Sequence, residues 1–200
     1  MVNSVYESSK YRKIRSITGN TIDSIVKSGE SERKAIQANL RNSIGREVDY
    51  VIGTLPVIME NIPEDMLSTN GSETDVERVL LNVLQLYAIS SQGYEQIEPV
   101  EPEEKKKIGN VGDSIRQLRR GENTVALDRR FNAMVASDDY DEVIVHLRHL
   151  FKLLKSKGEL KIDFIQLSED LLKIKNGKER NILMRWARRY YAYQNKQSGK

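Results

Sequence analysis

The sequence contains no cysteine, which excludes disulfide bonds and thiolate metal sites and is typical of a protein of the reducing cytoplasm. Proline is also scarce, with four in 200 residues, and the long stretches between prolines favour helix. No apolar run approaches the ~20 residues that a membrane span needs, and the N-terminus has no apolar signal core. We therefore expect a cytoplasmic protein, rich in helix, without a membrane segment.

The common catalytic motifs are missing as well. The chain has no Gly-rich phosphate loop of the Walker type, no HExxH and no cysteine nucleophile. Its two histidines, His146 and His149, are three residues apart, and no third metal ligand is evident nearby. We expect no enzyme activity, no cofactor and no bound metal.

One acidic cluster keeps a catalytic alternative open. The carboxylates of Asp138, Asp139, Asp141 and Glu142 resemble the metal site of a nuclease. They also stand where a helix is predicted to begin, and capping and the helix dipole favour carboxylates there. We expect the capping role.

Charge is distributed unevenly along the chain. Residues 28–104 hold five Lys and Arg against fifteen Asp and Glu, whereas residues 143–200 hold fourteen Lys and Arg against five Asp and Glu. Such a split suggests that a basic face meets a polyanion, while the acidic part is solvated or contacts protein.

Apolar residues recur with a period of 3.6, and no convincing two-residue alternation is present, so we predict an all-α fold. We expect Gly19-Asn20 to interrupt the first helix, Ser31 to cap the third, and Asn176-Gly177 to form a turn before the last. The predicted helical segments are 4–17, 21–27, 32–44, 46–60 (broken by Gly53 and Pro56), 74–90, 113–120 (ending at Gly121), 124–136 (capped by Asn123 or Thr124), 138–155, 163–174 (capped by Asp163) and 178–193.

Residues 93–107 combine two prolines with a block of charge and are the clearest linker. They separate an acidic N-terminal half, residues 1–92, from a basic C-terminal half, residues 108–200. We predict that the two halves pack together as a helical bundle.

The last helix has an apolar face that includes Trp186 and Tyr190. We expect Trp186 to pack in the core rather than to stack on a base, since a large ring at a core position is usually buried. Arg185 and Arg189 lie at the edge of this face and Arg188 points away from it. We expect Arg188 and Arg189 to be surface charges that contribute little to stability.

Several other helices also carry cations, including the stripe of Arg148, Lys152 and Lys155, and rigid cations suit a phosphate backbone that is bound without reading its sequence. For Arg129 and Arg130 an alternative is a structural ion pair with Asp113, Asp128 or Asp170. The candidate nucleic-acid-binding residues are Arg119, Arg120, Arg129, Arg130, Arg148, Lys152, Lys155, Lys157, Arg185, Arg188 and Arg189.

The order and spacing of five segments resemble the CasB family, the small subunit of the type I-E CRISPR surveillance complex known as Cascade. The first half resembles the family only loosely, through VLLNVLQLYAIS (79–90). The five segments are IGNVGDSIRQLRRG (108–121), LDRRFNAMVAS (127–137), HLRHLFKLLKSKG (146–158), IDFIQLSEDLLK (162–173) and RWARRYYAY (185–193).

This resemblance implies an all-α, non-enzymatic subunit that is present in two copies and contacts the other Cascade subunits. It also implies that the basic candidates help to hold the target and non-target DNA strands when guide RNA pairs with the target. Two alternatives remain at this point. One is a helical protein-interaction adaptor without nucleic-acid affinity, and the other is a metal-dependent nuclease that uses the carboxylates of residues 138–142.

Overall fold

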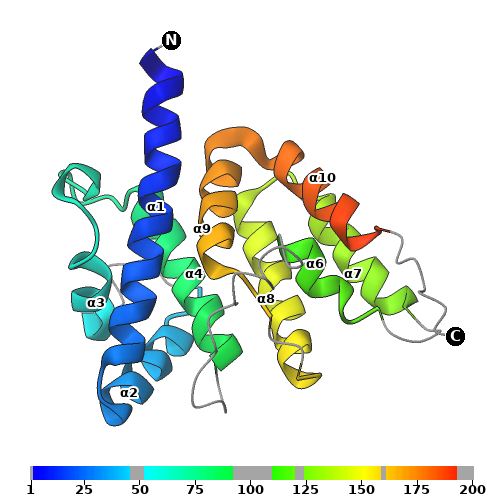
Figure 1. Ribbon diagram of the computed structural model, residues 1–200, viewed down its shortest axis with the longest axis horizontal. Coiled ribbons are helices and arrows are strands. Elements are labelled where there is room, and N and C mark those ends of the chain that lie inside the picture. The colour runs from blue at the N-terminus through cyan, green and yellow to red at the C-terminus, as the bar shows by residue number, and fades with distance from the viewer. Residues whose placement is uncertain (1, 46–51, 92–109, 120–123, 159–160, 193–200) are drawn as a thin grey trace, which may run out of the picture.

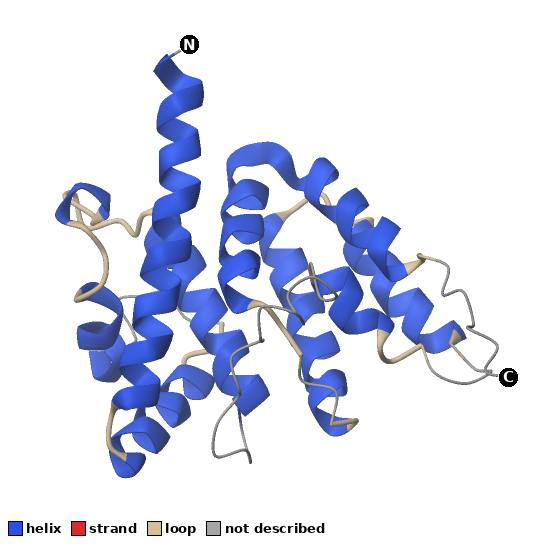
Figure 2. Ribbon diagram, in the orientation of Figure 1, coloured by secondary structure: helices blue, strands red, loops and turns tan. Residues whose placement is uncertain are grey.

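The computed structural model describes residues 2–45, 52–91, 110–119, 124–158 and 161–192, with side chains from residue 9 onward. Within these ranges every regular element is a helix, which confirms the all-α prediction (Figure 2). The predicted linker, 93–107, lies outside them. The helices are α1 (Val2–Lys27), α2 (Glu30–Asn42), α3 (Leu55–Met59), α4 (Asp75–Ser91), α6 (Val111–Arg116), α7 (Val125–Val135), α8 (Tyr140–Ser156), α9 (Phe164–Lys173) and α10 (Glu179–Tyr190), with short 3₁₀ turns at Ile52–Thr54 and Glu64–Met66.

Helix α4 is the centre of the molecule. Its wide apolar band predicts burial on most sides, and nearly every side chain from Val76 to Ser91 is buried. It packs against α1 and α2 on one side and against α8 and α9 on the other (Figure 1). One continuous hydrophobic core therefore joins the N-terminal and C-terminal halves, as predicted for a packed bundle.

Helix α1 runs without a break through Gly19, so the predicted interruption is wrong. Glycine in a helix interior costs about 1 kcal/mol, but Ile14, Ile17 and Ile25 of the same helix are buried, and this burial more than offsets that cost. The packing of α1 on α9 also includes polar contacts, since Arg15 donates hydrogen bonds to Glu169 at 2.8 Å and to Gln166 at 2.6 Å.

The ends of the later helices mostly follow the predicted turn and cap chemistry. Asp163 accepts a hydrogen bond from the backbone N–H of Gln166 at 2.9 Å, which confirms the predicted cap of α9. Asn176 and Gly177 form the predicted turn before α10, with Gly177 at a φ of 75°. Thr124 stands at the start of α7 without making a capping hydrogen bond.

Two predicted boundaries are wrong, and one predicted break is confirmed. Ser31 does not cap α2, because the helix already begins at Glu30, after Gly29. The predicted break between Gly53 and Pro56 falls at Thr54, where a 3₁₀ turn ends and α3 begins, with Pro56 in the first helical turn because no intrahelical bond needs its N–H there. Helix α6 begins two residues before Asp113, because the Asn110 side chain caps it by accepting from the N–H of Gly112 at 2.8 Å.

Helices α6, α7 and α10 form the end of the molecule farthest from α1 (Figure 1). Here α10 lies very close to α6. A Cβ atom added to Gly112 would sit 2.0 Å from the carbonyl oxygen of Trp186, closer than any real side chain is found. The absence of a side chain at this position therefore sets the distance between the two helices.

Candidate nucleic-acid interface

The last helix, α10, carries the tryptophan and three of the candidate arginines. Trp186 and Tyr190 are both 0% exposed, which confirms the prediction that Trp186 packs in the core. The indole Nε1 of Trp186 donates a hydrogen bond to Asp170 Oδ2 at 2.7 Å. A buried ring that is held in this way has no face free for a nucleic-acid base.

Asp170, on α9, is a fully buried carboxylate whose charge is compensated by α10. Arg185 pairs with its Oδ1 oxygen, and Gln166 donates to the same oxygen at 2.8 Å. A buried carboxylate is stable only when it is paired and hydrogen-bonded. The candidate residue Arg185 is therefore a structural counter-ion.

Arg189 has the same role for a second buried carboxylate. Its Nε lies 2.9 Å from both oxygens of Asp113, whose side chain is 1% exposed, and Arg116 lies 3.5 Å from one of them. The prediction that Arg189 is an ordinary surface charge is wrong. Periodicity placed it at the edge of the apolar face, and α6 meets the helix at that edge.

A third carboxylate, Asp128 of α7, joins three elements. It lies 3.1 Å from Arg119 Nε and accepts hydrogen bonds from the hydroxyls of Tyr190 and Thr124 at 2.5 and 2.9 Å. Burial raises the pKa of Asp128, but the hydrogen bonds from Tyr190 and Thr124 and the charge of Arg119 outweigh it and lower the pKa below its ordinary value. Burial and the bond to Asp128 raise the pKa of the Tyr190 hydroxyl.

The candidate Arg148 of α8 is half-buried against α4. It donates to Gln85 Oε1 at 2.9 Å, and Gln85 in turn donates to the carbonyl oxygen of Ser43 at 3.0 Å. Asn82 donates to Gln85 at 3.3 Å and accepts from Tyr140 at 3.0 Å. Burial, and then the charge of the nearby Arg78, lower the pKa of Arg148. Arg148 is thus part of a buried polar network that links the two halves.

The remaining candidates lie on the outer surface of the basic helices. Arg129 and Arg130 on α7 are exposed, and the three carboxylates considered as their partners, Asp113, Asp128 and Asp170, pair with other arginines. The alternative of structural ion pairs for Arg129 and Arg130 is therefore wrong. Lys152, Lys157 and Arg188 are also exposed and Lys155 is partly exposed, whereas Arg120 lies outside the described residues.

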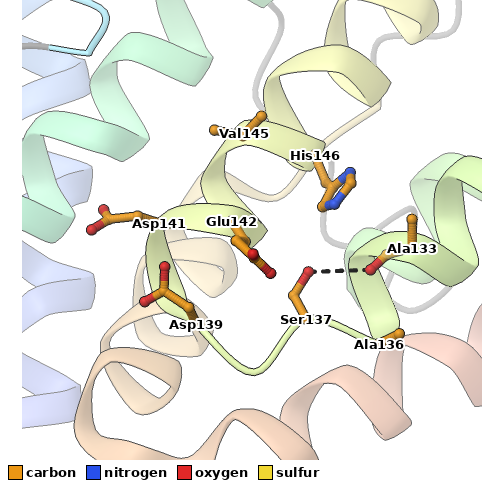
Figure 3. A pocket seen from close by; sticks show the side chains of 8 residues that line it. All are labelled: Ala133, Ala136, Ser137, Asp139, Asp141, Glu142, Val145 and His146. Atoms are coloured by element: carbon orange, nitrogen blue, oxygen red, sulfur yellow. Dashed lines mark hydrogen bonds between the residues drawn. The ribbon is translucent and has the colours of Figure 1, made fainter.

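The acidic cluster at the start of α8 borders a shallow, open pocket between α7 and α8, which Figure 3 shows. Asp139 stands at the N-cap position, but its side chain makes no capping hydrogen bond, so the predicted capping is wrong for Asp139. Asp141 and Glu142 lie in the first turn of α8, where the helix dipole favours carboxylates. Glu142 points toward Ser137, and Asp141 points away from it and lies 3.3 Å from Arg78 (Figure 3). Among the described residues, no group of three or more His, Asp or Glu side chains is arranged to hold a metal ion.

The polar network around Gln85 was not predicted from the sequence. The signal was present, because Asn82 and Gln85 are polar residues inside the most apolar predicted helix, at a spacing of three. Polar side chains at core positions need partners, and a buried tyrosine such as Tyr140 also needs a partner for its hydroxyl.

The fold and this surface define an all-α protein whose basic C-terminal helices neutralise buried carboxylates with some arginines and expose other cations to solvent. None of the described helices is both long enough and apolar enough to span a membrane. The comparisons with known proteins agree with this class.

A family model described as CRISPR-associated protein Cse2 matches residues 37–191, so the chain belongs to this family, also called CasB, a family of Cascade subunits in CRISPR defence. A solved structure, the crystal structure of CasB from Thermobifida fusca, has a similar fold, with a TM-score of 0.61 and 20% sequence identity over 93% of this chain and 97% of that chain. No curated protein sequence matches the chain. Family membership implies that its partners are the other Cascade subunits.

Proposed function

We propose that this chain is a non-catalytic subunit of Cascade that binds DNA strands without sequence specificity and so stabilises the R-loop formed by guide RNA and target. In this proposal the subunit works in the cytoplasm, and the assembly contains a second copy of it. Base pairing with the guide supplies the sequence specificity, so a subunit of this kind needs only contacts to phosphates.

This proposal is supported by the observation that, in the part of the chain that the structure describes, some cations of the basic half are paired with carboxylates, whereas others are exposed without such a partner. Arg119, Arg185 and Arg189 form ion pairs with carboxylates. A second set is exposed on α7, α8 and α10, and within the described residues its members have no carboxylate partner. These are Arg129, Arg130, Lys152, Lys157 and Arg188.

The exposed set is suited to a polyanion for physical reasons. Each side chain extends from a helix or from its C-cap, so its position is fixed by a packed element rather than by a loop. Cations that are hydrated in the free protein can neutralise phosphates and release counterions without breaking an internal ion pair. An arginine such as Arg189, by contrast, would leave a buried carboxylate behind.

The test is a salt titration of DNA binding. The variant Arg129→Gln/Arg130→Gln is expected to weaken binding to all DNA sequences alike. It should also flatten the plot of log affinity against log salt by about one unit for each lost phosphate contact. The matched control is Lys27→Gln/Lys34→Gln, which removes two exposed cations from α1 and α2 in the acidic half.

The two alternatives give different results in the same experiment. A protein-interaction adaptor would show no DNA affinity in the wild-type chain. A nuclease would cleave DNA in the presence of magnesium or manganese, and Asp138→Ala/Asp139→Ala would abolish the cleavage. Equal salt slopes for the α7 variant and its control would place the DNA surface elsewhere, with Lys152 and Lys157 the next residues to change.

A further inference from the structure

Tyr191 is the one exposed ring among the Tyr, Phe and Trp side chains that the structure describes. It is 43% exposed and directly follows α10, whereas Trp186, Tyr190 and Phe131 nearby are fully buried. An exposed aromatic ring on a basic surface has a known physical use in single-strand binding, because any nucleic-acid base can stack on it.

The ring of Tyr191 is held in a fixed orientation. Its hydroxyl donates to Asn132 Oδ1 on α7 at 2.7 Å. It stands nearly perpendicular to the stacked rings of Phe131 and Tyr190, at interplanar angles of 84° and 82°. The guanidinium of Arg119 lies over one face of the ring, 5.1 Å from its centroid, so a base can stack only on the other face. A ring that is already ordered loses little conformational entropy when a base stacks on it.

Two exposed arginines lie about one helical turn from the residues that make and hold this ring. Arg188 lies three residues before Tyr191, and Arg129 lies three residues before Asn132, which holds the Tyr191 hydroxyl. Residues three apart on a helix share a face and are separated by about 4.5 Å along the axis. Helices α7 and α10 run in opposite directions in this region (Figure 1), so one helical turn back from Asn132 and one helical turn back from Tyr191 lead in opposite directions along the helix pair.

We propose that Tyr191 is a stacking platform for one base of a single-stranded nucleic acid, with Arg188 and Arg129 binding the phosphates on either side of that base. This inference rests on the proposed function and specifies its ligand as an unpaired strand. A duplex keeps its bases stacked on one another, so it has no free base face to offer the ring.

The experiment uses the full chain and two strands of equal length, oligo-dT and an abasic strand with the same number of phosphates. Wild type is expected to bind oligo-dT about tenfold more tightly than the abasic strand. Tyr191→Leu, which removes the ring but keeps an apolar side chain, should bind both strands with the affinity that wild type has for the abasic strand. Tyr191→Phe keeps the ring and should retain the preference for oligo-dT.

The two strands also separate failure of this inference from failure of the proposed function. Binding of the abasic strand by Tyr191→Leu shows that the variant is folded and that its phosphate contacts are intact. A Tyr191→Leu variant that keeps the full preference for oligo-dT overturns the stacking role, and so does a wild type that binds both strands equally. If wild type binds neither strand, the proposed function itself is wrong.

Discussion

Arg189 and Asp113 are 76 residues apart in sequence, yet the guanidinium Nε lies 2.9 Å from both carboxylate oxygens, and this contact fixes α10 on α6. The neighbouring residue, Arg188, points to solvent. Two adjacent arginines in one helix therefore have different roles, one structural and one available to a ligand.

This difference predicts opposite effects of two single substitutions. Arg189→Ala should destabilise the protein by about 1–3 kcal/mol, because it removes the guanidinium whose Nε lies 2.9 Å from both oxygens of the buried Asp113 carboxylate. Arg188→Ala should change stability by less than about 0.5 kcal/mol, because it removes an exposed charge. Urea unfolding of both variants measures the difference.

DNA binding by the same two variants completes the comparison. Arg188→Ala should weaken binding, whereas Arg189→Ala should leave the affinity of the folded fraction close to wild type. Equal loss of stability in both variants would contradict the structural role of the pair between Arg189 and Asp113.

A second prediction concerns the close approach of α6 and α10. Gly112→Ala should destabilise the protein by at least about 1–3 kcal/mol, because its methyl group would meet the Trp186 carbonyl oxygen at 2.0 Å and the backbone would have to move. Gly19→Ala is the matched control. Its methyl group would make an ordinary contact with Ile165 at 3.5 Å, so better helix propensity should stabilise α1 by about 0.5–1 kcal/mol.

Thermal melts of the two glycine variants test this prediction, with melting temperatures expected to move in opposite directions. A Gly112→Ala protein as stable as wild type would mean that α6 and α10 are farther apart than the structure places them.

Helical periodicity was enough to predict much of the fold. It placed Trp186 in the core and predicted a buried central helix over residues 74–90, because a strongly periodic helix shows from its sequence which faces are apolar and which are polar. It failed at Gly19, where packing along α1 overrides a weak local preference. Local propensity gives the conformation that a short segment prefers in isolation. The free energy of burying its side chains in the folded protein is larger and determines the conformation that is adopted.

The candidate site was predicted less completely, for a different reason. Periodicity shows which face of a helix a residue occupies, but not which helix meets that face. The arginines at the edge of the last helix, Arg185 and Arg189, were therefore assigned to DNA, although α9 and α6 each bring a buried carboxylate to them. Contacts between residues this far apart in sequence depend on the complete packing arrangement.

A third prediction concerns the indole of Trp186. Trp186→Ala removes a large buried ring and should cost about 3–5 kcal/mol of stability. Trp186→Phe keeps most of the ring but leaves Asp170 Oδ2 without its hydrogen bond, which should cost about 1–3 kcal/mol. Chemical denaturation gives both values, and a Trp186→Phe variant as stable as wild type would show that this hydrogen bond contributes nothing.

The last prediction concerns acid stability. Burial raises the pKa of Glu169, but hydrogen bonds from Lys173 and Arg15 outweigh it and lower the pKa, as Tyr190, Thr124 and Arg119 lower that of Asp128. A carboxylate whose pKa is lower in the folded state contributes stability that is fully present above its unfolded value, about 4, and is lost as pH falls through the folded value. The protein should therefore lose stability below about pH 5.

Asp128→Asn should lower stability at pH 7 and reduce the loss between about pH 5 and pH 3, because the variant has no carboxylate to protonate at this position. Its matched control is Asp138→Asn, which removes the same charge from an exposed position. Urea midpoints at pH 7, 5, 4 and 3 give the stability of each protein, and the difference from wild type isolates one carboxylate from all the others that titrate in this range. If the difference between wild type and Asp128→Asn stays constant from pH 7 to pH 3, the contacts of Tyr190, Thr124 and Arg119 do not favour the charged form of Asp128.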